Sequence, residues 1–130
     1  MNQILDTDQQ RREAWIARLN ALADEVTFWC QSEGWAVERG ENTIREPSLG
    51  SYAVPSLRIT LSGGELLLNP IALEVIGGDG RVDLEAFPTL SRVKLVGDSG
   101  GWKIMTDSNI PLRQPWERQT FVQLAHDLLS

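Results

Sequence analysis

The chain opens with a stretch in which apolar side chains recur every three or four residues. Thr7 and Gln10 have the spacing of a capping box, and Gly34 is a natural residue just beyond a helix end. The pattern therefore predicts a helix over residues 8–33, with one face buried against a sheet. A seam for a partner helix is the alternative, but fewer than three clean heptads are present. The apolar stripe comprises Trp15, Leu19, Leu22, Val26 and Trp29, with Ile16, Ala23 and Cys30 along one side.

From residue 35 to residue 107 the hydrophobic period shortens to two, which is typical of strands. Residues 46–55 are rich in proline and glycine and are expected to form a loop. Glycine-rich turns are expected at residues 63–64, 77–80 and 98–101. The predicted strands cover residues 35–39, 56–62, 65–68 continuing through a bend at Asn69-Pro70 to 71–76, 81–86, 92–96 and 102–106.

Two of these strands carry charges that would match across an antiparallel pair. Asp83 and Glu85 would face Arg92 and Lys94, an arrangement that stabilises neighbouring strands. The sheet is thus expected to be an antiparallel meander with one packed face and one solvated face of both charge signs.

A second helix ends the chain, with Pro115 at its first helical position. Its apolar stripe comprises Phe121, Leu124, Ala125 and Leu128. The elements together predict one α+β domain over residues 1–130: a long N-terminal helix, an antiparallel β-meander of about five to six strands, and a C-terminal helix. The element order is loosely similar to cystatin-type architectures, an analogy that implies no shared activity.

Composition and charge narrow the function classes. The 130 residues carry a formal net charge of −6, and the 12 basic residues form no stripe, which disfavours nucleic acid and anionic lipid as partners. The N-terminus lacks the pattern of a secretory signal, and the longest apolar stretch is too short to cross a membrane. A single cysteine allows no intrachain disulfide. We expect a cytoplasmic protein.

The segment Gly97-Asp98-Ser99-Gly100-Gly101 resembles the sequence around the nucleophile of trypsin-like serine proteases. Ser99, Asp107 and His126 also follow the nucleophile–acid–histidine order of α/β-hydrolases. However, no histidine precedes Ser99, and the residues after it resemble a strand rather than the helix of a nucleophile elbow. A hairpin turn explains these glycines without chemistry. A small hydrolase or ligand-binding enzyme centred on these three residues is therefore the alternative function.

Other candidate chemistry is weaker, and we expect no cofactor and no metal. Residues 107–109 offer clustered oxygen ligands, but such clusters usually cap turns. His126 is the only histidine, so a site with two histidines is excluded. Cys30 lies on the apolar side of the first helix and is expected to be an inert core thiol.

The remaining unexplained feature is the proline-punctuated segment 109–116. Leu112, Arg113 and Trp116 lie in it, and arginine and tryptophan are enriched in interface hot spots. Tyr52, in the predicted loop 46–55, is the other candidate contact residue. Burial of the segment under the core is the alternative. The sequence thus predicts a non-enzymatic protein-binding module, an adaptor, chaperone-like or inhibitor-like protein, with a basic protein as one specific partner class. Homo-oligomerisation remains a third possibility.

Overall fold

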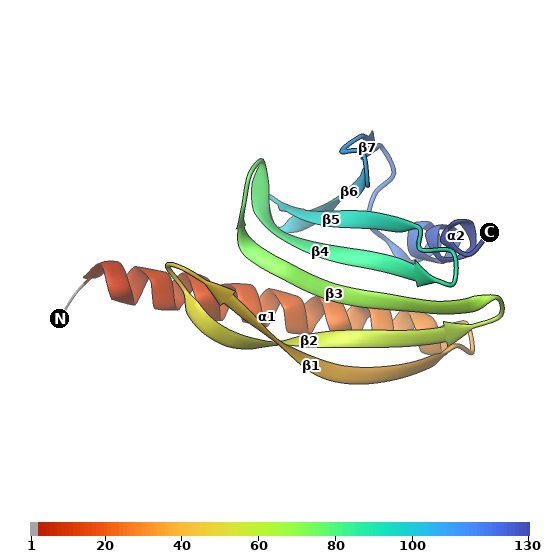
Figure 1. The fold of residues 1–130 in the computed structure, drawn as a ribbon, viewed down its shortest axis with the longest axis horizontal. Coiled ribbons are helices and arrows are strands. Elements are labelled where there is room, and N and C mark those ends of the chain that lie inside the picture. The colour runs from red at the N-terminus through yellow and green to blue at the C-terminus, as the bar shows by residue number, and fades with distance from the viewer. Residues whose placement is uncertain (1–2) are drawn as a thin grey trace.

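The computed structural model describes residues 3–130 and confirms the α+β class. An N-terminal helix is followed by one seven-stranded antiparallel sheet and a C-terminal helix (Figure 1). The elements are α1 (Gln3–Ser32), β1 (Ala36–Glu46), β2 (Gly50–Leu61), β3 (Gly64–Val75), β4 (Gly78–Phe87), β5 (Arg92–Asp98), β6 (Gly101–Thr106), β7 (Pro111–Leu112) and α2 (Arg118–Leu128).

Helix α1 ends as predicted but begins earlier. Gly34 adopts a φ of 78°, and the N–H groups of Gly34 and Trp35 donate to the carbonyls of Gln31 and Cys30. This is a Schellman motif, in which glycine tolerates the left-handed conformation. The helix begins at Gln3, so Thr7 lies inside it and the predicted capping box at its start is wrong.

The sheet is a continuous meander in which each strand pairs with its neighbours in sequence, from β1 to β7. The predicted turn at 98–101 is confirmed, whereas the one predicted at 63–64 lies one residue earlier, at 62–63. The bend at Asn69-Pro70 appears as a register shift between Pro70 and Ala72. The turn predicted at 77–80 lies earlier, at residues 76–77, and residues 78–80 belong to β4. β7, which pairs with β6 through Ile104 and Leu112, was not predicted because two residues carry no periodicity.

The predicted loop 46–55 is wrong, because only residues 47–49 form a turn there. β1 and β2 pair along their whole length, from Ala36 with Thr60 to Glu46 with Gly50. Pro55 is tolerated in β2 because residues 50–56 pair with β1 alone and have no partner in β3. On the side of β3, the N–H that proline lacks would therefore have no hydrogen-bond partner in a strand. The buried positions of β2 change parity between Ser56 and Leu57, which indicates a strong twist of this ribbon (Figure 1).

The predicted charge pairing between β4 and β5 is confirmed. Asp83 pairs with Lys94 and Glu85 with Arg92 in the strand register. The Arg92 guanidinium lies 2.8 Å from Asp107 and within 3.9 Å of Glu85, and its pKa is raised chiefly by the hydrogen bonds to Asp107. These charges lie on the sheet face opposite the core.

The core lies between the sheet and the two helices. α1 packs on β1, β2 and β3, and α2 contacts β4 (Figure 1). At the C-terminal end of α1, an aromatic cluster joins the two helices. It comprises Trp29, Trp35, Trp116 and Phe121. α2 begins at Arg118, with Glu117 at its N-cap, so the predicted start at Pro115 is wrong.

Within residues 3–130, neither helix is long and apolar enough to cross a membrane.

Candidate functional site

The structure separates the residues of the predicted hydrolase site. Ser99 lies in the turn before β6, and Asp107 follows the other end of this six-residue strand. At about 3.3 Å per residue, the strand alone holds them roughly 20 Å apart. The Asp107 carboxylate accepts hydrogen bonds from Arg92, and the exposed His126 ring contacts Trp35 edge-on at 5.7 Å. Ser99 and Asp107 therefore do not form a nucleophile–acid pair.

The candidate interface residues fall in different environments. Tyr52 is 6% exposed within β2, so it offers no loop surface for contact. Leu112 is half-buried in β7, whereas Arg113 is exposed. Trp116 is half-buried, packs on Trp29 at 5.4 Å and donates its Nε1–H to Glu25 at 3.0 Å. Trp116 thus helps to anchor the 109–116 segment to α1, whereas Ile110 is 60% exposed, so the segment is not buried under the core as a whole.

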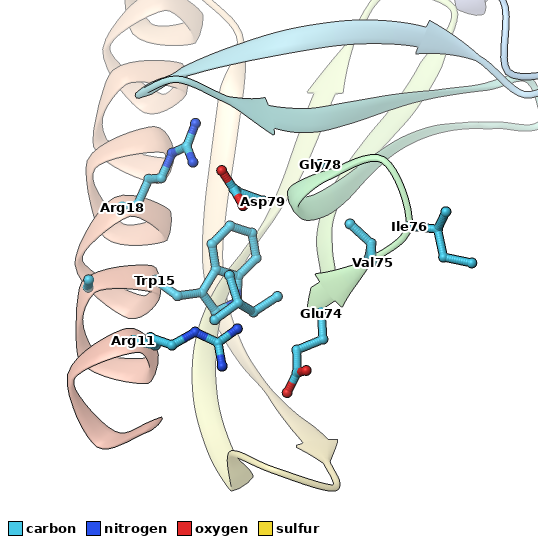
Figure 2. A pocket seen from close by; sticks show the side chains of 10 residues that line it. Arg11, Trp15, Arg18, Glu74, Val75, Ile76, Gly78 and Asp79 are labelled. Carbon is cyan, nitrogen blue, oxygen red and sulfur yellow. The ribbon is translucent and has the colours of Figure 1, made fainter. Parts of the chain in front are cut away.

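A hollow of about 560 Å³ lies between the first half of α1 and the β3–β4 turn (Figure 2). Arg11, Trp15 and Arg18 come from the helix, and Glu74 and Asp79 come from the opposite wall. The rest of its lining is largely apolar and comprises Ala14, Leu73, Val75, Ile76 and Gly78. Ile76, at the tip of the turn, is fully exposed.

The Trp15 ring is fixed between the walls of this hollow (Figure 2). Only 2% of Trp15 is exposed, and it packs against the backbone at Gly80, where a Cβ would lie 2.3 Å from the indole. Its other neighbour is Trp102 of β6, with ring centroids 6.0 Å apart. Because Gly80 has a φ of 101°, glycine is needed there both for the backbone and for the ring.

A second hollow, of about 450 Å³, continues along the same helix. Its lining comprises Arg18, Ala21, Leu22 and Glu25 of α1, Gly100, Gly101 and Trp102 of the β5–β6 hairpin, and Pro115 and Trp116. The helix residues of both hollows follow steps of three and four from Arg11 to Glu25, so they lie along one helix face. We call the two hollows together the α1 groove.

Arg18 lines both hollows and stands where they meet. Its guanidinium lies 4.3 Å above the Trp102 ring and donates to the Gly101 carbonyl. The Nε–H is buried and has no hydrogen-bond partner among the described residues. Burial lowers the pKa of Arg18, and the nearby Asp79 and Asp98 carboxylates oppose this effect.

Glu46 and Cys30 are buried in structural roles. The Glu46 carboxylate accepts hydrogen bonds from the Tyr52 hydroxyl and from the backbone N–H groups of Leu73 and Glu74, at 3.1 and 2.9 Å. It thereby ties the β1–β2 hairpin to β3. Burial of Cys30 raises the pKa of its thiol to about 12, with a smaller contribution from Glu33. Among the described residues, no group of three or more acidic, histidine or cysteine side chains could hold a metal.

Comparison with known proteins gives no further guidance, since no family model, curated protein or solved structure matches this chain.

Sequence reasoning missed the α1 groove. Arg11 is exposed and Arg18 half-buried, so both lie beside the buried stripe of α1. Arg18 follows Trp15 by three residues, so the two share one side of the helix. That spacing could have indicated the helix side of the groove. The opposite wall comes from residues 73–79 and 100–102, and no pattern in the sequence links these residues to α1.

Proposed function

We propose that this chain is a non-enzymatic protein-binding module, and that the α1 groove holds an extended segment of its partner. The observation that carries the proposal is the meeting of two hollows at Arg18 along one face of α1. Ligand sites are typically concave, mostly apolar and equipped with a few polar groups, as this groove is.

The length of the groove favours a short stretch of extended chain. Arg11 and Glu25 are fourteen residues apart on α1, which corresponds to about 21 Å along the helix axis. An extended segment of about six residues spans the same distance. Exposed Ala14 and Ala21 line the helix side of the two hollows, and their small side chains allow a chain to approach the helix closely.

The groove revises the predicted interface. Trp116 and the adjoining Pro115 contribute to it as walls of the second hollow. Arg113 and Leu112 remain predicted contacts beside it, and a basic partner remains an expectation that rests on the net charge of −6.

The proposal is tested by selecting ligands from a library of random peptides displayed on phage. Each peptide is fused to the phage coat protein through its C-terminus. The immobilised wild-type chain should enrich peptides that bind in solution with measurable affinity. Ala14→Tyr and Ala21→Tyr each place a ring in one hollow without altering the core. We expect each substitution to weaken the selected peptides at least about tenfold, a loss of roughly 1.4 kcal/mol.

Ala17→Tyr is the matched control, because Ala17 is also exposed on α1 but lines neither hollow. It should leave the affinity unchanged. Failure to enrich any peptide, or equal affinity for all three tyrosine variants, would contradict the proposal.

A further inference from the structure

Two arginines, Arg11 and Arg18, line the α1 groove, and only Arg11 has a described carboxylate within salt-bridge distance. Arg11 lies 3.4 Å from Asp8, whereas no described carboxylate lies within 4.0 Å of Arg18. The identified partners of its guanidinium are the Gly101 carbonyl and the Trp102 ring. The guanidinium is therefore partly removed from water without a close ionic partner.

A ligand that reaches this point affects Arg18 in one of two ways. An uncharged segment would exclude more water from the guanidinium and leave only the more distant Asp79 and Asp98 carboxylates to offset its charge, which is unfavourable. A carboxylate would accept hydrogen bonds from it, and such charge-assisted bonds are among the strongest in proteins. The site thus discriminates in favour of one negative group.

We propose that Arg18 is a specificity residue of the α1 groove, and that it binds one Asp or Glu side chain of the partner segment between apolar residues. This inference rests on the proposed function. The hollows lie on both sides of Arg18, so a bound chain continues in both directions past it. That arrangement favours an internal acidic residue over a C-terminal carboxylate, which would leave one hollow empty.

The surroundings limit the ligand to a single negative charge at this point. Asp79 lines the first hollow on the wall opposite Arg18 (Figure 2), and Asp98 is close enough to act on Arg18 electrostatically. Both repel any ligand carboxylate, so only one that hydrogen-bonds directly to Arg18 is favourable at this point. The apolar lining on either side, from Trp15 and Val75 to Trp102, suits aliphatic or aromatic neighbours of the acidic residue. A partner that is basic overall can carry such a residue.

The peptides selected on the wild-type chain supply the test. They should share one Asp or Glu flanked by apolar residues. A synthetic copy of one such peptide, blocked at both ends, is compared with its Glu-to-Gln (or Asp-to-Asn) version by titration calorimetry. We expect the amide version to bind about tenfold more weakly to the wild-type chain. Arg18→Gln should bind both versions equally, because the interaction between the two charged groups is then lost.

Arg11→Gln is the matched control, since it removes the other groove arginine, which already faces Asp8. It should keep the discrimination between the two peptides, and circular dichroism should show both variants folded. Selected peptides that lack an acidic residue, or discrimination that survives Arg18→Gln, would overturn the inference and leave the proposed function standing. A free-carboxylate peptide that binds more tightly than its internal-acid counterpart would also overturn it. Failure to select any groove-dependent peptide would overturn both.

Discussion

The guanidinium of Arg18 lies 4.3 Å above the ring of Trp102, across the gap between α1 and the β5–β6 hairpin. This contact, together with the hydrogen bond to Gly101, connects α1 to the β5–β6 hairpin, and Gly101 follows Arg18 by 83 residues. Arg18 also lines both hollows of the α1 groove. A residue that supports the fold is thereby also the one that any segment in the groove must pass.

Gly80 is expected to be less replaceable than Gly77, the other glycine with a positive φ at the β3–β4 turn. Gly80→Ala should lower the free energy of unfolding by about 3 kcal/mol, because its Cβ would overlap the Trp15 ring and its φ is positive. Gly77→Ala has a similar φ but open space around it, and should cost about 1 kcal/mol. Urea denaturation of both variants measures the difference. Equal losses would mean that Trp15 is not packed against Gly80.

Tyr52 should remain protonated in the folded protein at alkaline pH. Burial and the hydrogen bond to Glu46 raise its pKa above the ordinary value, which is about 10. The unfolded chain therefore ionises first, and the stability that Tyr52 contributes is lost as pH rises above about 10. Since the chain has one tyrosine, the rise in absorbance at 295 nm with pH reports on this residue alone, above the absorbance of the five tryptophans. Stability above pH 10 should fall more steeply in the wild type than in Tyr52→Phe, and early tyrosinate absorbance in folded protein would refute this account.

Cys30 should be unreactive while the protein is folded. It is fully buried, and its raised pKa, about 12, leaves almost no thiolate at pH 8. Ellman's reagent should therefore modify it only at the rate of unfolding, and immediately in 6 M guanidinium chloride. Because this is the only cysteine, the reaction has a single site. Stoichiometric modification on mixing with folded protein would show that the thiol is accessible.

Trp116 is expected to stabilise the fold through its ring more than through its N–H. Trp116→Phe removes the hydrogen bond to Glu25 and should cost about 1 kcal/mol. Trp116→Ala also removes the ring from Trp29 and Phe121 and should cost about 3 kcal/mol. Thermal unfolding of the two variants compares the contribution of the hydrogen bond with that of the ring packing. An unchanged melting temperature for Trp116→Ala would mean that the residue is not packed and serves the surface alone.

Local patterns predicted much of the fold. The apolar stripe of α1, the glycine turns and the match of Asp83 and Glu85 with Lys94 and Arg92 all depend on residues that are near in sequence or on neighbouring strands. Pro55 was misleading, because its effect depends on whether β2 has a partner on its second side, which is a property of the sheet rather than of the residue. Tyr52 was misplaced for the same reason.

The candidate site was less predictable than the fold. The short pattern around Ser99 matched a protease motif in sequence, yet its residues form a hairpin turn remote from Asp107. The α1 groove arises where Arg18 meets Asp79 and Trp102, and these lie on separate strands and on a helix. Only the folded chain brings them together, so no motif marks them.

The most direct test of the account is the affinity of one selected peptide for Ala21→Tyr and for Ala17→Tyr, measured side by side by titration calorimetry. The two variants add the same ring at exposed positions of α1, and only Ala21 lines the groove. The account predicts at least about tenfold weaker binding to Ala21→Tyr and wild-type affinity for Ala17→Tyr. Equal affinity for both variants would contradict it.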